Sequence, residues 1–173
     1  MSKLASRTRW YDVFHTDWGW VAAIGSEKGV RHTSLPEETP ERALDHLAAP
    51  MAKEQPEHRP GAFADLHRQL DEYLAGERQA FDVPLDLEGA APFHRRAWEA
   101  CASVPRGETR TYRWLAEEAG NVLASRAAGQ AMAKNRVPLL IPCHRVVGSD
   151  GGLHGFAGPG IGMKSRLLEL EAL

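Results

Sequence analysis

Cys143 and His144 place a thiol and an imidazole side by side, directly after the apolar residues 137–142. A free thiol has a pKa of about 8.5 and attacks as the thiolate. A neighbouring imidazole can remove the thiol proton, directly or through a water, if a third group orients the ring. The pair therefore suits nucleophilic chemistry. On these two residues alone, a buried cysteine beside a structural histidine is the more common arrangement.

The residues before Cys143 are expected to hold its thiol in place. Residues 137–141 predict a short buried strand, and Pro142 restricts both its own backbone and that of Ile141. In a straight strand Cys143 and His144 would point to opposite faces. They can act together only if the chain turns at Cys143, as it does at the start of a helix.

Metal binding is not favoured by the cysteine content. Cys101 and Cys143 lie too far apart to match a zinc-ligand spacing. Cys101 falls on the apolar face of a helix predicted over residues 93–104, where we expect it to be an unreactive part of the core. Two cysteines give no disulfide framework, which is typical of a protein in the reducing cytoplasm.

Two short helices are predicted before the reactive pair. Thr111 is expected to cap a helix over residues 112–119 that ends at Gly120, and Ser125 to cap a second helix that continues to about Lys134. Two helices joined by a Gly-containing turn predict a helix-turn-helix. Many such pairs bind no nucleic acid, so the pattern alone leaves the function open.

The second of these helices is rich in small residues. Its interior glycine, Gly129, costs about 1 kcal/mol relative to alanine. Either a ligand approaches this face or the helix packs tightly against a neighbour. Arg126 stands among alanines at the start of the helix, where it can reach toward a ligand or remain a solvated charge.

The first half of the chain alternates short strands and helices. We expect strands over residues 10–14, 18–24 and 30–35, with a turn at 15–17 in the first hairpin. Further along we expect helices over 40–47 and 63–74, a loop over 50–60, a strand over 81–87 and a linker over 88–92.

Length and charge bound the class of protein. The 173 residues suit one large or two small domains, and 43% hydrophobic with 25% charged residues is ordinary for a globular protein. Residues 1–90 carry 10 basic and 16 acidic side chains, whereas residues 91–173 carry 11 basic and 7 acidic ones. The basic half suggests a face for a polyanion, or simply uneven surface charge. We find no secretory signal and no apolar run near the roughly 20 residues of a membrane span.

The segment Ile141-Pro142-Cys143-His144-Arg145-Val146-Val147 resembles the active-site signature of the O6-alkylguanine-DNA alkyltransferases. The resemblance extends from about Phe93 to Leu170, and the first half of the chain resembles the family only loosely. It implies a two-domain α/β fold. Residues 1–89 would form a small ribonuclease-H-like α/β domain, and residues 90–173 a helical domain with a winged-helix-like helix-turn-helix.

The resemblance also implies an activity. The protein would transfer a methyl or alkyl group from O6 of guanine, and also O4 of thymine, in double-stranded DNA to its own cysteine. The target nucleotide would first be flipped out of the stack. Each molecule would react once. The resemblance implies no cofactor and no metal, and a monomer that acts in the cytoplasm on DNA containing O6-alkylguanine.

Residue roles follow from the same resemblance. Cys143 would accept the alkyl group, His144 would be its base through a water, and Glu171 would orient His144. Asn135 would hold the turn before the thiol, and Tyr112 would donate to N3 of the flipped guanine. Arg126 would fill the vacated place in the stack. Further DNA contacts would come from Arg113, Ser125, Ala127 and Gly129, and the substrate pocket from Met132, Pro138, Val146, Phe156, Ala157 and Gly158.

Some alternatives and departures remain. Many relatives have tyrosine where this chain has Phe156, and the glycine-rich loop after it is one residue longer. Tyr112 can be a core residue, Asn135 a helix C-cap and Glu171 one more charge on a terminal helix. For the whole protein, the alternatives are a non-catalytic alkyltransferase-like protein that binds lesions and a cysteine hydrolase.

Overall fold

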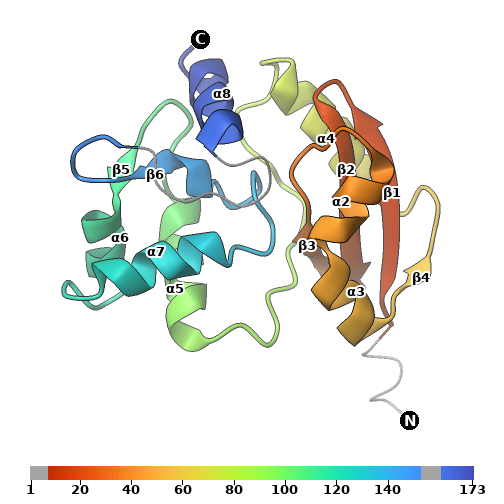
Figure 1. The fold of residues 1–173 in the computed structure, drawn as a ribbon, viewed down its shortest axis with the longest axis horizontal. Coiled ribbons are helices and arrows are strands. Elements are labelled where there is room, and N and C mark those ends of the chain that lie inside the picture. Colours follow the sequence, from red (N-terminus) through yellow and green to blue (C-terminus); the bar gives the residue numbers. More distant parts are fainter. Residues whose placement is uncertain (1–7, 153–160) are drawn as a thin grey trace. The chain divides into compact units, whose positions relative to one another are not determined.

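The chain was analysed as a computed structural model that describes residues 8–152 and 161–173 (Figure 1). It divides into two compact units, Met1–Asp86 and Leu87–Leu173. The boundary lies directly before the predicted linker at residues 88–92.

The first unit is built on a four-stranded sheet with the order β3-β2-β1-β4. Its strands are β1 (Trp10–Thr16), β2 (Gly19–Ser26), β3 (Gly29–Thr33) and β4 (Glu57–His58). The first three are antiparallel neighbours, and β4 runs parallel to β1. The predicted hairpin is present, but its turn lies two residues later than expected. Thr16 pairs with Gly19, and the Thr16 hydroxyl donates to the Gly19 carbonyl at 2.7 Å.

Helices lie against both faces of this sheet. α2 (Pro40–His46) is capped by Thr39, whose Oγ1 accepts from Arg42 N, and its Ala43 packs on Ala22 and Ile24. α4 (Ala64–Leu74) packs on the opposite face, where His67 stacks on Phe14. Here Gly25 is required, because a Cβ at that position would come within 2.9 Å of the Phe63 ring.

Two expectations for the first unit were wrong. Residues 50–60 were expected to be a loop, but they include most of α3 (Ala48–Glu54) and the short strand β4. Pro50 lies in the first turn of α3, where a missing N–H leaves no intrahelical bond unmade. Residues 81–87 form no extended strand. Only Leu85 bridges to Val30, since Pro84 has no N–H to continue a ladder.

The second unit is mainly helical. It contains α5 (Pro92–Ala102), α6 (Tyr112–Glu118), α7 (Ser125–Ala133) and α8 (Ile161–Glu171), with a parallel pair of two-residue strands, β5 (Arg110–Thr111) and β6 (Val146–Val147). α5, α6 and α7 contact one another around the buried side chains of Trp98, Leu115 and Ala131. The predicted helix-turn-helix is therefore present as α6 and α7.

The caps of this pair differ. As predicted, the Thr111 hydroxyl accepts from Trp114 N at 3.0 Å and begins α6. Ser125 does not cap α7, because it is the first helical residue and Ala124 occupies the cap position without a side-chain bond. Packing of Ala128 and Ala131 against the core, rather than a cap, therefore holds the start of α7.

Candidate active site

The segment before Cys143 is a tight turn and not the predicted strand. Pro138 and Ile141 form an isolated bridge, and Leu139 between them has φ 76°. The turn is held by Asn135, whose Nδ2 donates to the Ile141 carbonyl at 2.8 Å and whose Oδ1 accepts from Val137 N at 3.0 Å. The Asn135 amide thus pairs buried backbone groups that a strand would have paired with a neighbour.

Cys143 begins a one-turn 3-10 helix, Cys143–Arg145. Pro142 has φ −80° and ψ 65°, and Cys143 N donates to the Ile141 carbonyl at 2.8 Å, which is the geometry of an inverse γ-turn. The expectation that the chain must turn at Cys143 is confirmed. Cys143 and His144 consequently project from a short helix, so they need not point to opposite faces.

The Cys143 thiol is buried, and burial raises its pKa to about 11. Four influences act in the opposite direction and favour the thiolate: a hydrogen bond from Asn135, the charge of Lys164, and the backbone N–H groups of Cys143 and His144. At neutral pH the resting thiol is therefore protonated, and a base must take its proton before the sulfur can attack.

His144 is the candidate for that base. Its fully buried ring makes a 2.9 Å bond from Nε2 to Oε2 of Glu171, at the end of α8. Burial lowers the pKa of His144 more than Glu171 raises it, so we assign a neutral ring with its proton on Nε2. His144 Nδ1 makes no hydrogen bond with the residues that the structure describes. It therefore retains a lone pair that can accept a proton.

Arg145 completes this cluster and was missed by the sequence reasoning. It donates from Nε to Glu171 Oε1 at 2.9 Å, from Nη2 to Glu171 Oε2 at 2.7 Å and from Nη1 to the Val104 carbonyl at 2.7 Å. The two parallel bonds fix the carboxylate in one orientation. A buried arginine beside the reactive pair was visible in the sequence as a charge within an apolar segment.

Lys164 is the second residue that the sequence reasoning missed. It is fully buried on α8, donates to the Val146 carbonyl at 2.7 Å and lies 3.5 Å from the Tyr112 hydroxyl. Burial lowers its pKa. Lys164 lies on the same buried face of α8 as Leu167 and Glu171. A lysine is rarely buried without a partner, so its spacing from these residues could have indicated a role for it.

Tyr112 is brought to this site by the small parallel sheet. β5 pairs with β6 so that Arg110 lies opposite Val146 and Thr111 opposite Val147. Tyr112 follows β5 at the start of α6, and Cys143 to Arg145 precede β6. The sheet therefore brings Tyr112 and the reactive pair into one region, although 30 residues lie between Tyr112 and Cys143 in the sequence.

The outer face of α7 carries the residues expected to contact DNA. Arg126 is exposed and makes no hydrogen bond or ion pair with residues 8–152 or 161–173. Ser125, Ala127 and Gly129 are half-buried beside it. Arg113 on α6 is exposed and pairs only loosely with Glu117, at 3.7 Å.

The predicted pocket is only partly described. Met132, Pro138 and Val146 are buried, with Val146 next to the reactive turn. Phe156, Ala157 and Gly158 lie outside the described residues. Cys101 is buried in α5, and burial strongly raises the pKa of its thiol, in keeping with an unreactive residue.

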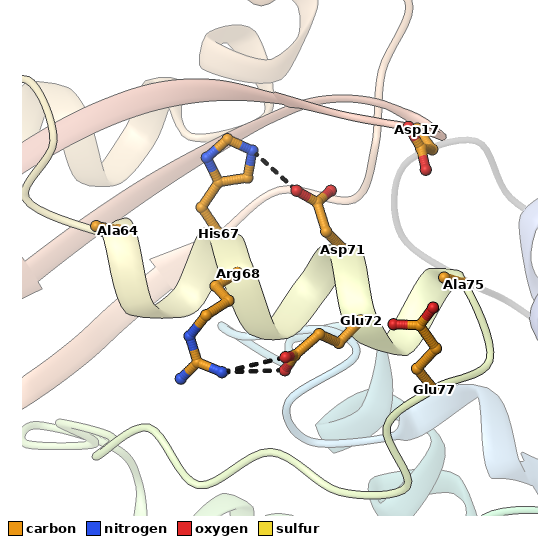
Figure 2. A pocket seen from close by; sticks show the side chains of 8 residues that line it. All are labelled: Asp17, Ala64, His67, Arg68, Asp71, Glu72, Ala75 and Glu77. Atoms are coloured by element: carbon orange, nitrogen blue, oxygen red, sulfur yellow. Dashed lines mark hydrogen bonds and ion pairs between the residues drawn. The ribbon is translucent and has the colours of Figure 1, made fainter.

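A separate hollow of about 580 Å³ lies on the first unit along α4 (Figure 2). Two of its carboxylates are paired, with His67 3.4 Å from Asp71 and Arg68 3.1 Å from Glu72. Two more, Asp17 and Glu77, also line it, so the hollow is acidic. It contains no thiol or hydroxyl nucleophile. Within the described ranges, no group of three or more His, Cys, Asp or Glu side chains is arranged to hold a metal, and no helix there is long and apolar enough to cross a membrane.

The fold and the site define a two-domain protein that joins an α/β unit to a helix-turn-helix unit with a buried Cys-His-Glu group. Two family models match the chain: the ribonuclease-like domain of 6-O-methylguanine DNA methyltransferase over residues 11–87, and its DNA binding domain over residues 92–173. The chain therefore belongs to the 6-O-methylguanine DNA methyltransferase family. The N-terminal ribonuclease-H-like domain and C-terminal helical domain expected from the sequence are confirmed.

Individual relatives agree with this membership. The chain is 37% identical to a methylated-DNA–protein-cysteine methyltransferase of Methanosarcina barkeri over 165 residues, which cover 94% of this chain and 96% of the relative. It is 36% identical in sequence to the solved O6-methylguanine methyltransferase of Mycobacterium tuberculosis, with a TM-score of 0.80 over 95% of this chain and 93% of that one. The solved complex of Mycobacterium tuberculosis OGT with DNA matches with a TM-score of 0.78 at 36% identity, over 94% and 92% of the two chains.

Proposed function

We propose that this protein repairs DNA by moving a methyl or larger alkyl group from O6 of guanine to the sulfur of Cys143. It is a methylated-DNA–[protein]-cysteine S-methyltransferase that acts once. The observation that carries the mechanism is the environment of His144: Glu171 holds its Nε2, while Nδ1 has no partner among the described residues. A neutral, oriented imidazole next to a protonated thiol is the arrangement that proton removal requires.

The proposed transfer consists of one proton removal and one displacement at the alkyl carbon. His144 Nδ1 takes the thiol proton, directly or through a water. The thiolate then attacks the alkyl carbon, so an S–C bond forms as the C–O6 bond breaks. The electron pair of the broken bond stays on the guanine, which leaves as an anion and takes up a proton. Glu171, held in place by Arg145, supplies the negative charge that stabilises the transient imidazolium.

Tyr112 is proposed to assist the leaving guanine by donating toward its N3 atom. The hydroxyl lies 3.5 Å from the Lys164 ammonium. Burial raises the pKa of the Tyr112 hydroxyl, so it stays protonated and can donate at neutral pH. The Tyr112 donor and the Lys164 cation together suit the negative charge that develops on the purine.

The reaction consumes the protein. The product is a thioether, and none of the proposed catalytic groups can displace the alkyl group from it. The same chemistry would serve O4-alkylthymine, where an alkyl carbon is likewise bonded to an exocyclic oxygen. The chain requires no cofactor for this transfer.

Duplex DNA is proposed to bind on the outer face of α7. The target O6 lies inside the base stack, so the nucleotide must rotate out to reach a buried thiol. Arg126 is exposed at the start of α7 and is proposed to occupy the vacated space. Ser125, Ala127 and Gly129, with Arg113 on α6, would contact the backbone without reading sequence. We further propose a monomer in the cytoplasm, because all proposed groups come from one chain and two unpaired cysteines suit a reducing compartment.

Intact-protein mass spectrometry tests the proposal. Incubation with an excess of duplex containing O6-methylguanine should add one methyl group per chain, located at Cys143, and then stop. Cys143→Ser should bind the same duplex without any gain in mass. Cys101→Ala is the matched control, and it should take up one methyl group like the unmodified chain. Continued turnover with an unmodified Cys143, or methylation elsewhere in Cys143→Ser, would contradict the proposal.

A further inference from the structure

Two neighbouring apolar side chains are exposed in the turn between α6 and α7. Leu123 is 92% exposed and Val122 is 48% exposed. Among the described residues, the only other large hydrophobic side chain that is exposed is Leu173, the last residue of the chain. Apart from the last residue, the exposed large apolar side chains among the described residues are therefore confined to this turn.

The turn that carries these side chains is held by defined contacts. Asn121 N donates to the Ala116 carbonyl at 2.9 Å, and Ala124 N donates to the Asn121 carbonyl at 3.0 Å. The Asn121 side chain accepts from Leu123 N at 3.1 Å. The backbone of Leu123 is thus fixed to the end of α6, and its side chain projects from a built turn.

The position of this turn connects it to the proposed DNA face. Leu123 lies two residues before the start of α7, and Arg126 follows three residues after Leu123. Ala124 and Ser125 between them are small and half-buried. The exposed apolar pair and the exposed cation consequently mark the same end of α7.

We propose that Val122 and Leu123 contact duplex DNA beside the extruded nucleotide, where they cover apolar sugar and base surface. This inference rests on the proposed function. Rotation of a nucleotide out of the stack leaves the faces of neighbouring bases uncovered, and Arg126 alone offers a narrow, charged replacement. Proteins that bend the minor groove use leucine and similar side chains for such contacts. The contact would not depend on salt, because it neutralises no phosphate.

Binding measurements test this contact. A fluorescent duplex with one O6-methylguanine is titrated with Cys143→Ser protein, so that no transfer disturbs the equilibrium, at several salt concentrations. Adding Leu123→Ala should weaken binding by about tenfold, the loss expected for a buried leucine side chain. The slope of log affinity against log salt should stay the same. Arg126→Ala should reduce that slope, because a phosphate or stack contact with a cation is lost.

Leu173→Ala is the matched control, since it removes the same atoms from a leucine that is 98% exposed. It should leave the affinity unchanged. Full affinity in Leu123→Ala, or equal weakening in Leu173→Ala, overturns the inference. A concentration-dependent dimer that forms without DNA and is lost in Leu123→Ala would also overturn it, by making the turn a contact between copies. If the unmodified chain binds the duplex but gains no methyl group, the proposed function fails. The affinities of Leu123→Ala and Leu173→Ala would then still show whether Leu123 contacts DNA.

Discussion

The Glu171 carboxylate is shared by two buried side chains. It accepts from His144 Nε2 and from two nitrogens of Arg145. A buried carboxylate is unfavourable unless a positive group compensates it, and Arg145 supplies that charge. His144 can therefore remain neutral, which a histidine paired with Glu171 alone would do less readily. The charge of Arg145 thus favours the neutral form of His144, which is the form that its proposed role as a base requires.

The titration of His144 gives a pH prediction. Its pKa in the folded protein is lowered below 6.5 by burial, so folding favours the neutral ring. The stability from this preference is complete above pH 6.5 and is lost as the pH falls through the folded-state pKa. We expect the free energy of unfolding in urea to fall below pH 6.5, with at most about 1.4 kcal/mol per pH unit due to this residue. The methyl-transfer rate should fall only at lower pH, where His144 becomes protonated in the folded protein.

His144→Gln is the comparison for that measurement, because glutamine keeps a polar side chain but cannot take the proton. Its unfolding free energy should vary less with pH below 6.5 than that of the unmodified protein. Equal pH dependence in both proteins would show that His144 does not titrate as assigned.

Lys164 gives a second prediction at this scale. Its charge is one of the influences that lower the pKa of Cys143 against the effect of burial. Lys164→Met removes the charge but keeps an unbranched side chain of similar length. We expect the transfer rate at pH 7 to fall by about tenfold for each unit by which the thiol pKa rises. The pKa of the Cys143 thiol, followed by thiolate absorbance during an alkaline titration, should be higher in Lys164→Met than in the unmodified protein.

The titration of the thiol distinguishes an effect of charge from an effect of packing. The Val146 carbonyl loses its donor in Lys164→Met, which is expected to cost about 1–3 kcal/mol of stability. Such a structural loss slows transfer without raising the pKa of the thiol. Slower transfer with an unchanged Cys143 pKa would therefore contradict the assigned effect of the Lys164 charge on the thiol.

At the scale of the element, α7 is shaped for close approach on its outer side. Gly129 was open to two explanations, tight helix packing or approach of a ligand. A Cβ at Gly129 would lie 3.9 Å from Tyr112 Cδ1, which is ordinary van der Waals contact. Packing inside the protein therefore does not require glycine there, and an approaching ligand is the better explanation.

Gly129→Ala tests that explanation. Alanine should stabilise α7 by up to about 1 kcal/mol, measured as a higher melting temperature. If the α7 backbone must come close to DNA, the same change should slow methyl transfer from duplex several-fold, and more than transfer from the free O6-methylguanine base. Equal slowing of both reactions would indicate displacement of the Tyr112 ring instead.

At the scale of the whole molecule, chemistry and charge are divided between the two units. The proposed reactive and DNA-contacting residues that the structure describes all lie within Leu87–Leu173, the basic part of the chain. The first unit instead contains a buried ion cluster. Arg31 Nη1 donates to Asp86 at 3.0 Å and Nε donates to Glu54 at 2.6 Å, which ties the end of the unit to β3. We assign that cluster to stability alone.

Arg31→Leu tests the assignment. Leaving Glu54 and Asp86 without their shared arginine should lower the unfolding free energy by on the order of 3 kcal/mol, measured in urea. Folded Arg31→Leu protein should still accept one methyl group per chain. Arg42→Leu is the matched control, since Arg42 forms only an exposed pair with Glu38, and it should change stability by less than about 1 kcal/mol. Loss of methyl uptake in folded Arg31→Leu would contradict the division.

Local patterns in the sequence determined the elements that depend on neighbouring residues. The apolar period of residues 63–74 predicted α4, and Thr111 predicted the start of α6. The adjacency of Cys143 and His144 predicted that the two side chains can act together only if the chain turns at Cys143, and the chain does turn there. These features depend on capping, periodicity and restricted backbone angles, which act over a few residues.

The tertiary structure decided which groups surround the thiol. The strand expected at residues 137–141 is a turn because the Asn135 side chain pairs its backbone groups. Lys164 enters the site, and Arg145 meets its partner Glu171, because α8 packs against the one-turn helix Cys143–Arg145. Glu171 meets His144 across 27 residues of chain. Contacts between distant segments depend on how whole elements pack, and no local pattern specifies that packing.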